Sequence, residues 1–378
     1  VTLQNVSGCV KINCHVFISE AERMNPIRIK AGKKAYALIK DRGFHFDLVT
    51  TYYAPAAGPR WLVASGFDLA LLQNGVLGQS QPVSLIGASA GAWRFAAWVQ
   101  PEPEKSYRTL MEKYITTTYT RNDTPATVLK SLSAIIDAYL EDDALPFAMA
   151  SKNYRLIVLT VRSKNLIASE VWLFQALGLG CVFLLNAVNQ ENIYRFFERV
   201  VFYQGAKPPH FCLVNGFRGR FIALKEVNFK YAVMASGAIP LVVGGVRDIY
   251  GAPKGVYRDG GMIDYHLTQN YAAQDQDVTL FFLHQERVIP GWMDKRLKHR
   301  QPPQDVLDNV LMVYPSDEFI QQLPGGKVPD RGDFKTFVDD PQTRIRNWQQ
   351  AVVQSAPLGE QFLELVASGK IRDVVELM

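Results

Sequence analysis

The stretch "PVSLIGASAGAWRFAAW", Pro82–Trp98, contains the change of structure on which the fold depends. Its first half is a short β-type run, and an alanine-rich run typical of a helix follows directly. Between them lies "GASAG", Gly87–Gly91, a GxSxG pattern whose small residues permit a sharp turn from strand to helix. We expect Ser89 to lie at the positive end of that helix, as a nucleophile would; the alternative is a serine that only caps the helix.

Strand-like and helix-like stretches alternate on both sides of this turn over about 280 residues. "FDLVTTYY", "YRLIVLTV" and "VTLFFLH" are typical of buried strands, and "TPATVLKSLSAIIDAYLED" is typical of a helix that Thr124 or Asp123 caps. The alternation predicts an α/β fold with a mostly parallel central sheet flanked by helices on both faces. We also expect Ile27–Gly43 to form one amphipathic helix.

The sequence changes character after Pro290, where charged and proline-rich segments replace the alternation. We therefore expect an α/β catalytic domain over residues 1–289 and a C-terminal helical extension, 290–378, packed on the core. Helices are predicted over about 341–356 and 359–368. We attribute the RGD triplet at Arg331–Asp333 to chance.

Two segments raise the question of membranes. Val171–Val188 is almost continuously apolar, and we interpret it as a buried crossover helix, with an interfacial or spanning helix as the alternative. The basic run Lys295–Arg300 is either a solvated face or a contact for anionic head groups. Helices within 101–150 are expected to form ordinary core or an acyl channel.

Composition limits the class of protein. Among 378 residues, 48% are hydrophobic and the formal charge is +5, which is ordinary for a globular chain and too weak to indicate nucleic-acid binding. The few, scattered cysteines fit a reducing compartment, so we expect a cytoplasmic protein, with peripheral membrane contact left open. Cys9, Cys14 and His15 lie close together but lack a second ligand pair, so no metal is expected.

A nucleophilic serine needs a base. His266, His284 and His299 lie where an ordinary α/β-hydrolase would supply one, but none belongs to a recognisable loop motif. Asp259 in "VYRDGGMIDY" is a better candidate, because Gly260 and Gly261 after it allow a sharp turn and a close backbone approach. A plain D-G turn is the alternative.

Upstream of the serine, the loop "APAAGPR" consists mostly of small residues and ends at Arg60. Such a loop can direct backbone N–H groups at an oxyanion, with the arginine adding positive charge nearby.

Four features now stand in a fixed order: "AAGPR", "GASAG", "MASGAIPLVV" at Met234–Val243, and "DGG" at Asp259. In this order they resemble the patatin-like phospholipases, a family of lipid acyl hydrolases. The resemblance covers roughly Tyr36–Leu283, and the C-terminal part contributes nothing to it.

The resemblance implies a Ser–Asp dyad without histidine, with Ser89 as nucleophile and Asp259 as base. It also implies oxyanion donors at the backbone N–H groups of Ala57, Gly58 and Ala90, with Arg60 supporting the loop. A carboxylate near its reference pKa of about 4 is a poor base, so the dyad needs a partly dry pocket. No metal or other cofactor is required.

The oxyanion loop departs from the family's glycine-rich pattern, because Ala56 and Ala57 stand where the family has glycines. A positive φ at either alanine would strain the loop by about 1 kcal/mol or more.

We expect a serine lipid acyl hydrolase that acts on lipid esters through an acyl-enzyme. Two alternatives stay open, namely a Ser-His-Asp esterase and a catalytically silent lipid-binding protein of the same fold. The sequence leaves open the lipid head group, the acyl chain length and the oligomeric state.

Overall fold

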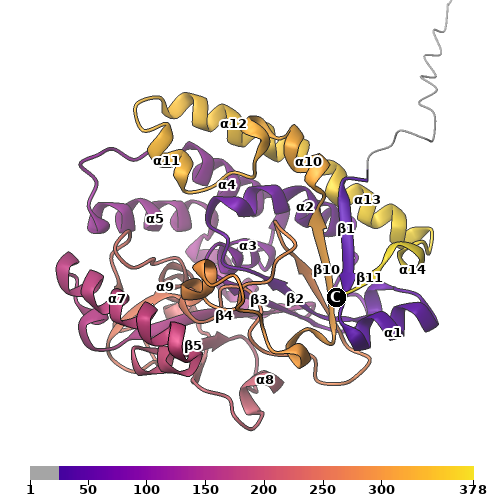
Figure 1. Ribbon diagram of the computed structural model, residues 1–378, viewed down its shortest axis with the longest axis horizontal. Helices are drawn as coiled ribbons and strands as arrows, with labels where there is room; N and C mark the ends of the chain where they lie inside the picture. The colour runs from indigo at the N-terminus through magenta and orange to yellow at the C-terminus, as the bar shows by residue number, and fades with distance from the viewer. Residues whose placement is uncertain (1–24) are drawn as a thin grey trace, which may run out of the picture.

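A computed structural model describes residues 25–378 and contains a single mixed sheet with helices on both of its faces (Figure 1). Its strands are β1 (Ile27–Ala31), β2 (Val49–Ala54), β3 (Val83–Ala88), β4 (Tyr154–Ser163), β5 (Phe197–Tyr203), β6 (Arg220–Ala223), β7 (Val246–Arg247), β8 (Val256–Asp259), β9 (Val278–Phe282), β10 (Val310–Pro315) and β11 (Glu376–Leu377). The strand order is β11-β1-β10-β9-β2-β3-β4-β5-β6, and β8 pairs with β4 and β7 outside that path.

The centre of the sheet is parallel, as the alternation predicts. Strands β10, β9, β2, β3 and β4 pair in parallel through consecutive neighbours. Antiparallel pairs join β1 to β10 and β4 to both β5 and β8. The predicted α/β class is therefore confirmed.

The helices are α1 (Lys33–Arg42), α2 (Ser65–Gln73), α3 (Ala90–Trp98), α4 (Pro103–Thr116), α5 (Pro125–Tyr139), α6 (Leu145–Met149), α7 (Trp172–Val188), α8 (His210–Leu213), α9 (Glu226–Ser236), α10 (Asp317–Gln322), α11 (Gly332–Thr336), α12 (Pro341–Gln354), α13 (Ala356–Ala367) and α14 (Ile371–Val374). Thr124 caps α5 as predicted, because its side chain accepts a hydrogen bond from the Thr127 N–H.

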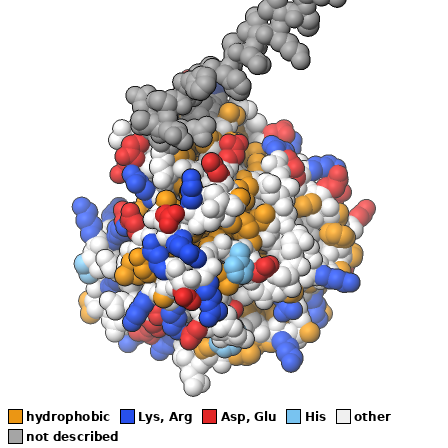
Figure 2. All heavy atoms as spheres, turned by 90° about the vertical axis from the view of Figure 1, so that its right-hand side faces the viewer, with side chains coloured by type: hydrophobic (Ala, Val, Ile, Leu, Met, Phe, Trp, Pro, Cys, Tyr) orange, Lys and Arg blue, Asp and Glu red, His pale blue; other side chains and the backbone are white. Residues whose placement is uncertain are grey.

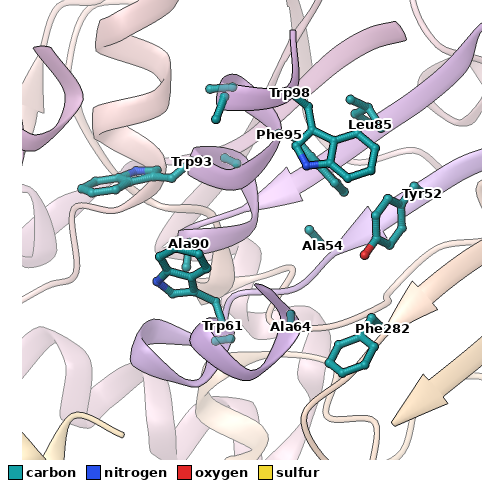
Figure 3. Close-up of a cluster of buried hydrophobic side chains, with 14 of the residues drawn as sticks. Tyr52, Ala54, Trp61, Ala64, Leu85, Ala90, Trp93, Phe95, Trp98 and Phe282 are labelled. Carbon is teal, nitrogen blue, oxygen red and sulfur yellow. The ribbon is translucent and has the colours of Figure 1, made fainter. Parts of the chain in front are cut away.

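Successive residues of the central strands alternate between two cores, one on each face of the sheet. Tyr52 and Leu85 face the larger core, whereas Tyr53 and Ile86 face the smaller one. The larger core contains α3, whose aromatic side chains Trp93, Phe95 and Trp98 are all buried (Figure 3). This packing fixes the start of α3, where Ser89 lies.

Residues after 289 contribute both helices and a sheet strand. Helix α13 packs on α2, and the Ser355 hydroxyl accepts a hydrogen bond from Gly66 N at 3.0 Å. Strand β10 lies inside the sheet between β9 and β1, a strand that the sequence reading did not anticipate. The domain boundary at residue 289 remains a prediction.

The single helix expected over Ile27–Gly43 is wrong, because strand β1 occupies its first part and α1 begins only at Lys33. Ile27, Ile29 and Ala31 are buried and alternate with less buried residues, which is the pattern of a strand. The hydrogen bonds to β10 outweigh the helical pattern seen in the sequence. Cys9, Cys14 and His15 lie outside the described residues.

The segment expected as a buried crossover helix forms α7, but one side of this helix is exposed, so its predicted burial is wrong. On the face that holds β1 and α13, basic and acidic side chains are interspersed with apolar ones (Figure 2). In the described part of the chain, no helix is long and apolar enough to cross a bilayer.

Candidate active site

Ser89 and Asp259 meet because β3 and β8 pair with the same edge of β4. Strand β3 ends with Ala88 opposite Leu159, and the antiparallel β8 ends with Asp259 opposite Thr160. Strand β5 occupies the other edge of β4 over these residues, so β3 and β8 point at each other end to end. Residues 170 positions apart in the chain thereby come together.

The backbone of Ser89 has the strained geometry of a nucleophile elbow. Its φ of 55° and ψ of −125° are unfavourable for a residue with a side chain and cost about 1–3 kcal/mol. The Ser236 hydroxyl holds this turn, because it accepts from Ser89 N at 2.8 Å and donates to the Leu159 carbonyl at 2.7 Å. The strain points Ser89 Oγ into the site instead of leaving it to cap α3.

The Asp259 carboxylate receives the serine hydroxyl directly. Ser89 Oγ donates to Asp259 Oδ2 at 2.6 Å, and Gly261 N donates to Oδ1 at 2.8 Å. Asp259 N donates to the Ala238 carbonyl at 3.0 Å. The segment around Ser236 and Ala238 therefore positions both members of the pair, which gives a structural role to the "MASGAIP" motif.

The environment of Asp259 makes it a stronger base than an ordinary aspartate. Burial is the largest influence and raises its pKa, whereas the Ser89 hydroxyl and the charge of Arg331 lower it. Burial prevails, so the pKa is raised overall. Burial therefore shifts Asp259 in the direction that a Ser–Asp dyad would require.

Close backbone contacts require the glycines that flank both residues. A Cβ at Gly91 would lie 2.1 Å from the Ala54 carbonyl oxygen, and one at Gly87 would lie 2.4 Å from Ala92 N. A Cβ at Gly260 would lie 2.1 Å from the Leu159 carbonyl oxygen, and one at Gly261 would clash with Ala56. Larger residues would separate the two strand ends that carry the pair.

The loop expected to bind the oxyanion has no positive φ at Ala56 or Ala57, so the backbone strain considered for these alanines is absent. Ala57 has a φ of −118°, Ala56 is not among the residues with positive φ, and the positive φ of 57° falls at Gly58. The loop is anchored beside the Asp259 turn, because Ala56 N donates to the Tyr265 carbonyl at 2.9 Å. Two alanines are thus compatible with the loop, since only its remaining glycine adopts a left-handed conformation.

Free backbone donors lie close to the serine. Gly58, Ser89 and Ala90 line the same cavity. Within residues 25–378, the N–H groups of Ala57, Gly58 and Ala90 donate to no backbone or side-chain acceptor. The N–H of Ala90 belongs to the first turn of α3, where the helix dipole also favours negative charge. Gly58 and Ala90 thus bring unpaired backbone N–H donors to the cavity that Ser89 lines, as the predicted oxyanion hole would require.

Two cations from the C-terminal part of the chain, Arg331 and Lys295, act on Asp259, and a third, Arg60, acts on the neighbouring Tyr265. Arg331 lines the cavity, and its Nε would lie 3.1 Å from a Cβ at Gly58. Lys295 lies with Nζ 4.1 Å from the centre of the Tyr265 ring; burial, then the charges of Arg331 and Arg60, lower its pKa to about 7. Burial raises the pKa of Tyr265, and the charge of Arg60 partly offsets this rise.

The cavity beside Ser89 has a volume of about 770 Å³, within the range of small-molecule binding sites. Helices α4 and α5 contribute to its wall, as the acyl-channel alternative for residues 101–150 would require. Much of the wall is apolar, and it includes Trp93, Leu132, Ile135, Ile239, Leu241 and Val243. No residue of α7 lines it.

The histidines that an ordinary esterase would use lie elsewhere. His266 is buried, and its Nδ1 accepts from Ile289 N at 2.9 Å. Burial lowers the pKa of His284 to about 3, helped by the charges of Arg60 and Lys295. Among the described residues neither imidazole hydrogen-bonds to Ser89 or Asp259, and His299 is exposed. The serine therefore contacts its carboxylate without an intervening imidazole.

Ser236, Lys295 and Arg331 were not predicted from the sequence as parts of the site. Ser236 lies inside a quoted motif, so a polar residue among small ones was a usable signal. Arg331 belongs to the RGD triplet that was attributed to chance, and nothing in the sequence connects it to Gly58. In the described residues, no group of three or more histidine, cysteine, aspartate or glutamate side chains is arranged to hold a metal ion.

Comparison with known proteins adds no assignment: no family model matches this chain, and no curated protein matches it either.

Proposed function

We propose that this chain is a serine acyl hydrolase of the patatin-like type, which cleaves carboxylic esters of lipids. The observation that carries the proposal is the 2.6 Å hydrogen bond from Ser89 Oγ to Asp259 Oδ2, at the wall of a largely apolar cavity. The order of the four motifs and the resemblance they carry support the same family.

The first half of the reaction forms an acyl-enzyme. Ser89 Oγ attacks the ester carbonyl carbon while its proton passes to Asp259 Oδ2. The carbonyl oxygen becomes an oxyanion that the N–H groups of Gly58 and Ala90 stabilise. The tetrahedral intermediate then collapses, the bond to the alcohol oxygen breaks, and the proton held by Asp259 passes to the leaving alcohol.

The second half repeats these steps with water. Asp259 removes a proton from a water molecule as its oxygen attacks the acyl carbon. The intermediate then releases Ser89 Oγ, which recovers the proton from Asp259, and the free fatty acid leaves. Each turnover consumes one ester and one water and returns both side chains to their starting states.

Two features compensate for the absence of histidine. Burial raises the pKa of Asp259, which increases its affinity for the proton in transfer. The preorganised amides lower the energy of the oxyanion, so proton loss and attack proceed together; one such donor contributes about 100- to 1000-fold in rate.

The cavity supports a lipid substrate more than a polar one. Its aromatic and aliphatic wall suits an acyl chain, whose burial is favourable by about 0.8 kcal/mol per methylene. Arg331 at the same cavity suits an anionic group elsewhere on the substrate, such as a phosphate. A phospholipid combines both groups.

Turnover of phospholipids, galactolipids, triglycerides and short-chain esters, measured for the wild type and Ser89→Ala, tests the proposal. We expect release of fatty acid by the wild type, with the largest kcat/KM on long-chain esters, and none by Ser89→Ala. Equal turnover by both proteins would assign the chemistry to another group. Lipid binding without turnover of any ester would instead support the silent lipid-binding protein.

A further inference from the structure

Helix α7 exposes many large apolar side chains and buries two amide side chains, unlike an ordinary surface helix. Its seventeen residues include no charged side chain. The buried residues are Gln175, Gly178, Leu179, Val182 and Asn186, at the spacing of one helical face. The exposed side chains include six large apolar ones, Trp172, Leu173, Phe174, Leu177, Leu184 and Val188.

Hydrogen bonds on the inner side hold this orientation. Gln175 Nε2 donates to the Ser169 carbonyl at 2.8 Å, and its Oε1 accepts from Leu241 N. Asn186 Nδ2 donates to Asp294 Oδ1 at 2.7 Å. Rotating α7 to bury its apolar side would break these buried hydrogen bonds, so the exposed face belongs to the folded structure.

The exposed face is much more apolar than a monomer surface usually is. Leu184 is 66% exposed, Trp172 is 64% exposed and Val188 is 84% exposed, all within one helix. Leu166 in the preceding turn is also exposed and packs beside Gly178 of α7. So many large apolar side chains exposed on one helix are typical of an interaction site.

Basic side chains at the end of α7 indicate the charge of its partner. Arg300 donates to the Asn186 carbonyl at 2.9 Å, which places the segment Lys295–Arg300 at the C-terminal end of the helix. Arg296, Lys298 and His299 of that segment are exposed.

The acidic groups nearby are already paired. Glu170 pairs with Arg258, Asp294 with Arg300, and Glu191 with Arg218. For Arg296 and Lys298, the described part of the chain provides no ion-pair partner. A positive field beside an uncharged apolar helix is complementary to an anionic lipid surface.

The cavity beside Ser89 adjoins this helix. Leu241 lines the cavity, and its N–H donates a hydrogen bond to Gln175 of α7. The neighbouring cavity residue Val242 is 48% exposed. We propose that the exposed side of α7, with Arg296 and Lys298, docks this protein on an anionic lipid bilayer, with α7 lying in the plane of the head groups. The link to the cavity depends on the proposed function, whereas the docking itself does not.

Vesicle co-sedimentation tests the docking without any need for turnover. We expect the wild type to bind vesicles of phosphatidylglycerol and phosphatidylcholine, and to bind pure phosphatidylcholine more weakly. Leu177→Asp with Leu184→Asp should reduce the partition coefficient about tenfold or more, because two exposed apolar anchors are lost. Arg296→Gln with Lys298→Gln should reduce binding to anionic vesicles and leave binding to neutral ones unchanged.

Two matched controls separate docking from catalysis and from general surface effects. Val353→Asp replaces an equally exposed apolar residue (74%) on α12 and should bind like the wild type. Ser89→Ala should also bind like the wild type, so a failure of the proposed reaction leaves the docking test intact. Trp172 fluorescence should be quenched by brominated lipids, and Trp172→Phe should lose that component.

If the α7 double variant bound vesicles as strongly as the wild type does, the proposal would be overturned. Equal binding of the wild type to anionic and neutral vesicles would also overturn it. A dimer by light scattering that the α7 double variant converts to a monomer, without vesicle binding by either, would assign the helix to self-association and also overturn it.

Discussion

Two buried aspartates of this protein have opposite surroundings. Asp68 on α2 is fully buried, and the guanidinium of Arg94 on α3 binds it with two hydrogen bonds of 2.6 and 2.7 Å. Tyr52 and Tyr107 each donate a further hydrogen bond of 2.5 Å to it. Asp259 is 5% exposed and receives only a serine hydroxyl and one backbone N–H.

The difference shows how a fold can hold one carboxylate in an ion pair and leave another available for the proposed reaction. Burial alone would lower the pKa of Arg94, but the Asp68 charge prevails and raises it, so the guanidinium stays charged and binds both carboxylate oxygens of Asp68. Within residues 25–378 no cation bonds directly to Asp259, and burial raises its pKa, so the proposed mechanism can use it as the base for Ser89. The same residue type thus joins helices in one place and, in the proposed mechanism, accepts a proton in the other.

Removing the reactive carboxylate should produce the largest effect. Asp259→Asn keeps the size of the side chain but removes the proton acceptor, so kcat on lipid esters should fall about 10³- to 10⁴-fold. Steady-state turnover measures this, and circular dichroism checks that the variant is folded. A variant with more than a tenth of the wild-type kcat would remove Asp259 from the dyad.

Breaking the structural pair should instead destabilise the fold. Arg94→Met leaves Asp68 buried without its cation, so the free energy of unfolding should drop by about 3–5 kcal/mol. Denaturant titration measures the change. Arg108→Gln, which removes an exposed ion pair with Glu104 on the same side of the fold, is the control and should cost at most about 0.5 kcal/mol. Equal losses in both variants would mean that the buried pair has no special role.

Arg331→Gln should make the surroundings of Asp259 even less like those of Asp68, because it removes a nearby cation. Loss of this cation removes an influence that lowers the Asp259 pKa, so the acid limb of the kcat profile should move to higher pH. At neutral pH we expect about a tenfold loss of kcat/KM on anionic lipids. Arg121→Gln is the control. Arg121 lines the same cavity but pairs with Asp339, so its loss should leave the acid limb of the kcat profile unchanged. An unshifted limb in Arg331→Gln would contradict the electrostatic role of Arg331.

The smallest effect concerns stability. The pKa of Asp259 is raised in the folded state, so the folded protein holds its proton more tightly than the unfolded chain does. The resulting destabilisation is complete above the folded-state pKa and disappears as pH falls below the unfolded value. Asp259→Asn should therefore stabilise the protein at pH 7 by about 1 kcal/mol, with no gain at pH 3. Thermal unfolding at both pH values measures this difference, and a variant destabilised at pH 7 would reverse the expected sign.

Local patterns in the sequence predicted the parallel sheet and most of its elements. The "GASAG" turn and the alternation around it are local, so β3, α3 and the class of fold could be read directly. Strand β1 was missed because its formation depends on β10, which is almost 300 residues away. The exposure of α7 was missed because its apolar composition says nothing about which side faces the protein.

The candidate site divides in the same way. Ser89 and Asp259 each occur in a recognisable motif, but their contact depends on the shared edge of β4, which no local pattern encodes. Arg331 and Lys295 come from a region without motifs, and only the folded chain brings Arg331 to the cavity and Lys295 to the Tyr265 ring.

The central claim is that Asp259, without histidine, activates Ser89. The most direct measurement is the rate at which a fluorophosphonate probe labels the protein, with the modified peptide identified by mass spectrometry. We predict a single adduct on Ser89 in the wild type, and labelling slowed at least about 100-fold in Asp259→Asn. An adduct on another residue, or an undiminished rate in Asp259→Asn, would contradict the claim.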